Sequence, residues 1–371
     1  MKKIREIIIT VLTAGFLLSF GVLFLILPKN KTQSEDENRI LASAPSFFNV
    51  LKSGFKEDFA SFLADRFPAR KTFVKTKAYA ELASGKAENN GVIFASDGYL
   101  ISRADTGEEA VKEAIGKALT AVSYTDNASV PTCFFLIGRT ADIESSELPS
   151  LYDSTGDEKL RAAVYDALCG KITTYDLTET LKNAAERGEY VCYKTDHHLT
   201  EYGGEYVYRA VIDVLGGERR EFAFENVSCE FLGTSYSAAG LVYKEKDTIT
   251  FASFDGIENI EVKTYSRSSD GYSESDAWLY DLDALSAKDK YKAYLCGNFA
   301  KVTVRKSGEE RERLLVIKDS YFNCVAPMLA ANYDLDIIDP RYMRAEDVAV
   351  LCGSSDYAAV ICVYGLETFV N

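Results

Sequence analysis

The chain has only two histidines among its 371 residues, and they are adjacent, at His197 and His198. Histidine is the side chain best suited to proton transfer near neutral pH. Any mechanism that uses a histidine as general base must therefore use this one segment. A histidine base elsewhere in the chain is excluded.

The eight cysteines include no Cys-x-x-Cys pair, so a zinc ribbon or a thioredoxin-like motif is unsupported. Four of them lie inside apolar runs typical of buried strands: Cys133, Cys192, Cys296 and Cys362. Small apolar thiols are common in protein interiors, so we expect mostly free, buried cysteines. Disulfides are the alternative for an exported chain.

Acidic residues outnumber basic ones, 56 to 42. The formal charge is −14, and the first 31 residues sum to +4, which leaves −18 for the rest. So acidic a body repels nucleic acid and anionic lipid, and nucleic-acid partners are not expected. The sequence also contains no internal repeat and no low-complexity tract.

The N-terminal segment has no charge from Ile7 to Leu27, a run of 21 residues. At about 1.5 Å per residue, a helix of that length crosses a hydrocarbon core. Lys2, Lys3 and Arg5 precede the run, which favours an N-terminus inside and an exported body. We therefore expect a single-pass membrane anchor over residues 1–30. A cleaved signal peptide, and hence a secreted protein, is the alternative, although no clear cleavage site follows.

After the anchor, a linker and a helical segment are expected over residues 31–88. Apolar residues recur at helical spacing through 47–84, and Pro68 divides this stretch into two helices. Residues 89–371 then alternate short apolar strands with helices, which predicts an α/β domain with a mainly parallel, two-sided sheet. Shorter β-like runs indicate a β-rich insertion at about 221–290. Buried strands are expected at 130–138, 172–176, 189–195, 313–319, 334–339 and 357–365.

The histidine pair follows an acid, in Asp196-His197-His198. Residues i and i+2 of an extended segment project to the same side. Asp196 would then orient His198 and stabilise its imidazolium, as the acid of a catalytic triad does. Two surface or capping histidines are the alternative. A metal site is disfavoured because adjacent side chains point apart and no second cluster supplies matching ligands, so no metal or cofactor is expected.

A serine follows the apolar strand at 313–319, where a strand ends and a helix is expected to begin. This layout exposes the Ser320 hydroxyl at the carboxyl end of a sheet, close to the N–H groups of a helix start. Such groups can stabilise an oxyanion. The alternative is that Ser320 only caps its helix. A Gly297-Asn298 turn ends another apolar run, and the Asn298 amide could donate to the same oxyanion, although Gly-Asn is also ordinary turn chemistry.

Together these segments resemble the DHHW protein family and the related alginate O-acetylation proteins, which have an SGNH-hydrolase-like domain. The resemblance rests on TDHHLT at 195–200, on LLVIKDSYFN at 314–323 and on LCGNF at 295–299. It also includes Glu-Asn-Arg at 37–39, DRFPAR at 65–70 and SDGYL at 96–100. Leu199 departs from the family, because it replaces the tryptophan of the DHHW block and removes an expected stacking surface beside the histidine. Lys318 replaces the glycine of the common GDS serine block.

The resemblance implies an SGNH-hydrolase-like fold and a triad of Ser320 as nucleophile, His198 as general base and Asp196 as orienting acid. It further implies three oxyanion donors, at Tyr321, Asn298 and Gly297. It also implies three substrate contacts, at Arg139, His197 and Tyr193. For Arg139 a solvated charge at a strand end is the alternative.

The function that follows is a serine-dependent O-acyltransferase or esterase outside the cytoplasm. Its expected partners are an exported polysaccharide or cell-wall glycan and a membrane acyl-donor protein. Two alternatives remain: a non-catalytic glycan-binding or assembly protein, and a structural envelope protein. The distance between the His198 ring and the Ser320 hydroxyl separates the catalytic hypothesis from the structural one.

Overall fold

The computed structural model describes residues 2–29, 32–34, 39–46, 50, 54–240 and 245–370. Contacts divide the chain into two compact units, residues 1–89 with 237–242, and residues 90–236 with 243–371. Two positions used in the sequence patterns, 37 and 38, lie outside the described residues, as do 47–49 and 51–53 of the predicted helical stretch.

The first unit contains three helices among its described residues: α1 (Lys2–Ile26), α2 (Phe55–Asp65) and α3 (Arg70–Ala83). Its short strands are β1 (Gln33–Ser34), β2 (Arg39–Ile40) and β3 (Glu88–Asn89). In α1, residues Lys3–Ile26 are long and apolar enough to cross a membrane, and none of that stretch is buried in the protein. The predicted break at Pro68 is confirmed, because α2 ends before it and α3 begins after it.

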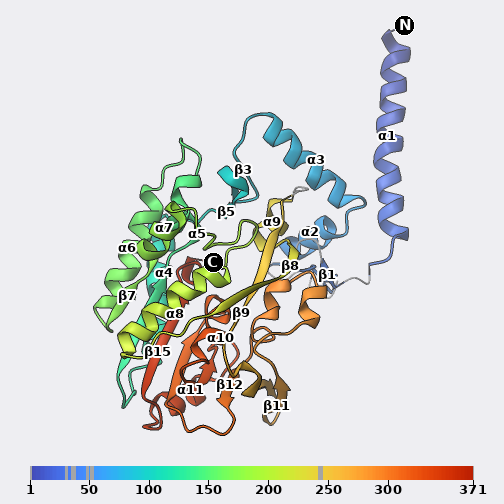
Figure 1. The fold of residues 1–371 in the computed structure, drawn as a ribbon. Coiled ribbons are helices and arrows are strands. Elements are labelled where there is room, and N and C mark those ends of the chain that lie inside the picture. The colour runs from blue at the N-terminus through green and yellow to red at the C-terminus, as the bar shows by residue number, and fades with distance from the viewer. Residues whose placement is uncertain are drawn as a thin grey trace. The chain divides into compact units, whose positions relative to one another are not determined.

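The second unit is built on an eight-stranded sheet in the order β11-β10-β12-β14-β13-β15-β6-β7 (Figure 1). The strands are β6 (Thr132–Ile137), β7 (Thr174–Asp176), β10 (Ile260–Ser268), β11 (Gly271–Ala277), β12 (Lys301–Lys306), β13 (Arg313–Lys318), β14 (Asp334–Ile338) and β15 (Ala359–Gly365). The five strands from β14 to β7 are parallel, and β12, β10 and β11 continue the sheet in antiparallel pairs. The predicted α/β class with a mainly parallel sheet is confirmed.

Helices cover both faces of this sheet: α4 (Glu108–Ser123), α5 (Thr140–Ile143), α6 (Thr155–Cys169), α7 (Thr178–Glu186), α8 (Glu201–Leu215), α10 (Ala326–Leu329), α11 (Ala345–Cys352) and α12 (Glu367–Val370). Side chains alternate along a strand, so β13 serves two cores. Leu314 and Val316 pack with α7, α8 and α10, whereas Leu315 and Ile317 pack with α4, α6 and α11. Removing apolar surface from water in each core stabilises the folded chain by about 25 cal/mol per Å².

The structure corrects the predicted β-rich insertion. Strands β10 and β11 were assigned to it, but β10 pairs with β12 in a register from Ile260 to Tyr265, so both belong to the main sheet. Of the strands described within that stretch, β8 (Ala223–Phe231) and β9 (Asp247–Ser253) alone form a separate two-stranded sheet. Strands β4 (Val92–Phe94) and β5 (Leu100–Ser102) form an antiparallel hairpin around Asp97-Gly98.

Two further segments differ from expectation. Residues 189–195 are not a strand, and a single bridge between Cys192 and Leu199 closes a tight loop instead. The helix expected after β13 is a 3₁₀ turn, η7 (Ser320–Cys324), followed by the short α10. Both irregular segments lie where the candidate catalytic residues are found.

Candidate active site

Ser320 is the first residue of η7, separated from the end of β13 by Asp319, and it is partly exposed. Asp319 caps η7, since its Oδ1 accepts a hydrogen bond of 2.9 Å from the Tyr321 N–H. The other carboxylate oxygen accepts from the Gly365 N–H at 2.8 Å and from Thr368 Oγ1 at 2.6 Å. Asp319 thus ties the serine turn to the end of β15, which fixes the Ser320 backbone.

The loop closed by Cys192 and Leu199 brings the chain's two histidines to this serine. His198 Nε2 lies 2.8 Å from Ser320 Oγ, and His198 Nδ1 lies 2.5 Å from Asp196 Oδ1. A carboxylate only accepts hydrogen bonds, so the Nδ1 atom carries the proton and Nε2 accepts from the serine hydroxyl. Asp196 also accepts a 3.1 Å bond from the His198 backbone N–H. The i, i+2 relation inferred from the sequence is what the structure contains.

Asp196 is fixed from its other side by residues that the sequence did not single out. Its Oδ2 accepts bonds from the Thr234 N–H at 2.7 Å and from Thr234 Oγ1 at 2.9 Å. Gly233 permits this approach, because a Cβ there would lie 2.2 Å from the Asp196 Cβ. No local sequence pattern links residues 233–234 to Asp196, since the contact is made across 38 residues.

The loop itself is held by Asp247, at the start of β9. Its Oδ2 accepts from the Thr195 N–H at 2.7 Å and from Thr195 Oγ1 at 2.5 Å, and its Oδ1 accepts from the Lys194 N–H at 2.8 Å. These bonds take the backbone donors that a strand ladder would have used. They explain why residues 189–195 turn instead of pairing.

Burial sets the protonation of the histidine. It lowers the pKa of His198 to about 4, His197 adds to the effect, and Asp196 opposes it. Burial alone would raise the pKa of Asp196, but the two imidazoles and the hydrogen bonds from His198 and Thr234 hold it well below its usual range. At neutral pH the pair is therefore a neutral imidazole beside an ionised carboxylate, which can accept the Ser320 proton.

Tyr291, on the 3₁₀ turn η6 (Lys290–Ala293), supplies the stacking surface that the sequence appeared to lack. Its ring is parallel to that of His198 within 10°, with centroids 3.9 Å apart. Its hydroxyl donates a 3.0 Å bond to the Ser320 carbonyl oxygen. Leu199, at the position of the family tryptophan, is instead wholly buried in the core. The expectation of a missing surface was wrong, because a residue distant in sequence occupies that place.

Two of the three predicted oxyanion donors are already engaged. The Tyr321 N–H is bonded to Asp319, and the Gly297 N–H donates to the Tyr294 carbonyl at 3.1 Å. These two predictions are corrected. The Ser320 N–H is a better candidate, since among the described residues none accepts a hydrogen bond from it. Asn298 remains a candidate as predicted.

Lys318 fixes the orientation of Asn298. Its ammonium, fully buried, donates to Asn298 Oδ1 at 2.7 Å and to Asn323 Oδ1 at 2.8 Å, and lies 3.6 Å from Asp339 Oδ2. An ammonium donates only, so the amide oxygen of Asn298 faces Lys318 and its Nδ2 points the other way. Burial lowers the pKa of Lys318 to about 8 in spite of Asp339. The lysine that replaces the glycine of GDS thus has a specific contact.

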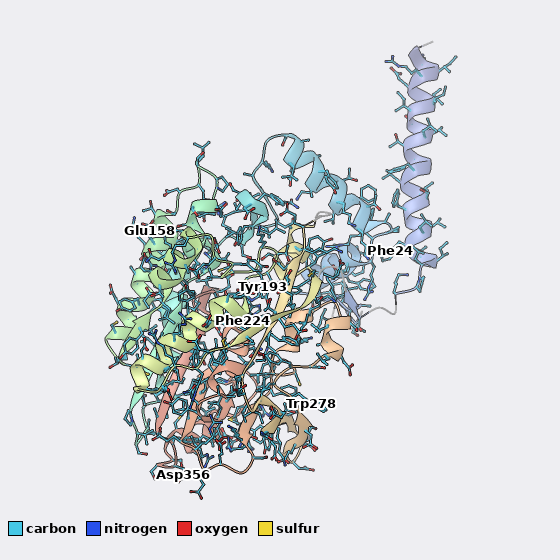
Figure 2. All side chains as sticks on the ribbon, in the orientation of Figure 1. Phe24, Glu158, Tyr193, Phe224, Trp278 and Asp356 are labelled. Carbon is cyan, nitrogen blue, oxygen red and sulfur yellow. The ribbon has the colours of Figure 1, made fainter. Side chains whose placement is uncertain are left out.

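Two predicted substrate contacts are buried and are corrected. Arg139 is 1% exposed, with Nη1 2.7 Å from Asp157 and Nε 2.6 Å from Glu367, so its charge is balanced inside the protein. Tyr193, labelled in Figure 2, is fully buried, and its hydroxyl lies 3.0 Å from that of Tyr294. His197 is half-buried, and its ring is tilted by 35° against that of His198, with centroids 3.9 Å apart. Its Nδ1 forms a hydrogen bond of 2.7 Å with Thr234 Oγ1. Its contact with substrate stays a prediction.

The ligand atoms of Asp196, His197 and His198 lie within 4.8 Å of one another, as in a metal site. Their hydrogen bonds show another use for these atoms. Both ring nitrogens of His198 are engaged, with Asp196 and Ser320, and His197 Nδ1 is bonded to Thr234. The arrangement is that of a proton relay ending on a serine hydroxyl.

The chain was compared with known protein sequences and solved structures. No curated protein sequence matches the chain. Among solved structures, Bacillus cereus PatB1 with a sulfonyl adduct is 17% identical, with a TM-score of 0.61 over 76% of this chain and 97% of that one. Another structure of Bacillus cereus PatB1 is 16% identical, with a TM-score of 0.58 over 74% of this chain and 96% of that one. A DHHW family protein from Eubacterium siraeum is 16% identical, with a TM-score of 0.54 over 76% and 93%.

At these identities the likeness concerns the fold. The family assignment rests on the sequence model described as DHHW protein, which matches residues 150–338, just over half of the chain. That stretch contains Asp196, His198 and Ser320, the three side chains that the structure joins by hydrogen bonds. The chain belongs to the DHHW protein family.

Proposed function

We propose that the protein is a serine-dependent O-acyltransferase or esterase that acts on acetyl groups of an exported or cell-surface polysaccharide. The observation that supports this is the continuous relay from Asp196 through His198 to Ser320, with distances of 2.5 and 2.8 Å. A serine hydroxyl that is only a helix cap has no need of an imidazole oriented by a buried carboxylate. Asp319, not Ser320, caps η7.

In the proposed mechanism, neutral His198 takes the proton of Ser320 Oγ as that oxygen attacks the acyl carbonyl. The Ser320 N–H and the Asn298 amide donate to the oxyanion that forms. His198 then returns its proton to the leaving oxygen, and an acyl-serine remains. A sugar hydroxyl or a water, deprotonated by the same imidazole, takes the acyl group and restores the serine.

The place of action proposed is outside the cytoplasm, with α1 as anchor. Lys2, Lys3 and Arg5 precede its apolar stretch and favour an N-terminus inside. A glycan substrate and a membrane acyl-donor protein are the partners proposed with it. The non-catalytic alternative drew on the missing tryptophan at 199, and Tyr291 now occupies that role beside the histidine.

The test is hydrolysis of p-nitrophenyl acetate by the full-length protein in detergent. Ser320→Ala should lower kcat by at least about 10⁴-fold, because the nucleophile is lost. A sulfonyl fluoride reagent should label the wild type at Ser320 and leave the variant unlabelled, as the sulfonyl adduct of PatB1 suggests. The control is Ser146→Ala, an exposed serine. Equal turnover by the Ser320 variant would refute the proposal.

A further inference from the structure

A concave site lies on the main sheet, between α11 and the β10–β11 hairpin. We call it the tyrosine pocket. Its volume is about 230 Å³. It is lined by Tyr265, Tyr272, Lys301, Met343, Asp347, Val350 and Leu351. The volume is below the range typical of drug-sized ligands and suits a single six-membered ring.

Strand register relates this pocket to the serine. Tyr265 of β10 pairs with Lys301 of β12, and Lys301 pairs with Ile338 of β14. Ile338 in turn pairs with Ile317 of β13, three residues before Ser320. Strands are about 4.8 Å apart, so the row spans roughly 14 Å. The row ends at Ile317, so the pocket and Ser320 both lie toward the carboxyl ends of the parallel strands.

The loop after β14 connects the two places. Arg341 is bonded to Asp339 through Nε at 2.9 Å and Nη2 at 2.6 Å, and its charge acts on His198. Tyr342 follows and is 45% exposed, and Met343 then lines the pocket. Three consecutive residues thus lead from the neighbourhood of the histidine to the pocket.

The lining combines aromatic rings with paired polar groups. The Tyr272 hydroxyl donates to Asp347 Oδ2 at 2.7 Å, and the Lys301 ammonium lies 4.7 Å from the centre of the Tyr265 ring. The rim is apolar at Val350, which is 73% exposed. A sugar ring presents an apolar C–H face and a rim of hydroxyls. Tyrosine rings next to a carboxylate and an ammonium match both parts.

We infer that the tyrosine pocket binds one ring of a neutral polysaccharide whose acetylated or acceptor residue lies at Ser320. This inference rests on the proposed function and names the substrate class. A neutral chain is favoured over a polyanion because the sequence after residue 31 carries −18, which repels anionic polymers. The pocket has one lysine and one aspartate, so its own charges are balanced.

The experiment measures binding and chemistry separately on the full-length protein in detergent. Calorimetry with an N-acetylglucosamine pentasaccharide as probe should give saturable binding, and Tyr265→Ala should weaken the Kd by about tenfold or more through loss of the ring. Val350→Glu, on the exposed rim, should weaken it in the same direction without disturbing the core. Tyr79→Ala, an exposed tyrosine of α3, is the matched control and should leave the Kd unchanged.

Hydrolysis of p-nitrophenyl acetate should stay within twofold in all three variants, since that ester is too small to reach the pocket. No binding of the neutral probe to the wild type, or equal binding by Tyr265→Ala and Val350→Glu, would overturn the inference even with normal ester turnover. Tighter binding of an oligomannuronate of equal length would overturn the neutral class. No hydrolysis of p-nitrophenyl acetate by the wild type would instead refute the proposed function, so the two failures are distinguishable.

Discussion

Replacing Lys318 with methionine tests whether this lysine orients Asn298, the proposed oxyanion donor, independently of its effect on folding. The ammonium holds Asn298 Oδ1 at 2.7 Å, and the variant releases that amide. Loss of one oriented oxyanion donor typically lowers kcat by about 10²–10³. Because the effect arises in the transition state, kcat for p-nitrophenyl acetate should fall while KM changes little.

Lys318→Met should not lower the stability of the fold. Burial lowers the pKa of Lys318 from 10.5 to about 8, a difference equivalent to roughly 3 kcal/mol. The unfolded chain binds this proton more tightly, so wild-type stability should rise as pH increases from about 8 to 10.5. Methionine removes the buried charge, and Asp339 keeps its pair with Arg341. Urea unfolding at pH 7 should therefore show a variant at least as stable as the wild type.

A double-mutant cycle with Asn298→Ala completes the test. If Lys318 acts through Asn298, each single variant should lose a similar factor in kcat, and the double variant should lose little more. Lys318→Arg, which keeps a cation, should retain part of the activity. Additive losses, or full activity in Lys318→Met, would refute the reasoning.

Three other predictions use the same assays. Tyr291→Phe keeps the ring over His198 and should retain most of the activity. Tyr291→Ala should lower kcat about tenfold or more, because the imidazole loses its stacking partner. Equal losses of kcat in the two variants would contradict this. Only neutral His198 accepts the serine proton, so kcat/KM should be constant at neutral pH and fall below about pH 4, and a limb centred near 6.5 would contradict the effect of burial. Burial raises the pKa of Glu201 from 4.5 to about 8, so the free energy of unfolding should decrease from pH 4.5 to 8 by up to roughly 5 kcal/mol. Urea unfolding of Glu201→Gln should show a smaller decrease over this range. The exposed control Glu221→Gln should match the wild type.

Local chemistry accounts for the predictions that failed near the serine. Serine is a favoured helix cap, but aspartate is equally favoured, and Asp319 accepts the Tyr321 N–H. The same rule, applied to the residue before Ser320, would have removed Tyr321 from the oxyanion donors. Arg139 stands at the end of β6, where a charge is ordinarily solvated. Only the fold brings Asp157 and Glu367 to it from distant helices.

The sequence by itself determined the class of sheet, the break at Pro68 and the candidate for the general base, because apolar periodicity is local and the chain has one histidine pair. It also determined the i, i+2 relation of Asp196 and His198, which depends on a few bonds of one segment. Tertiary structure alone decided what lies around them. Lys318, Tyr291, Thr234 and Asp247 make hydrogen bonds with residues 20 to 52 positions away in the sequence, and no local pattern encodes such a contact.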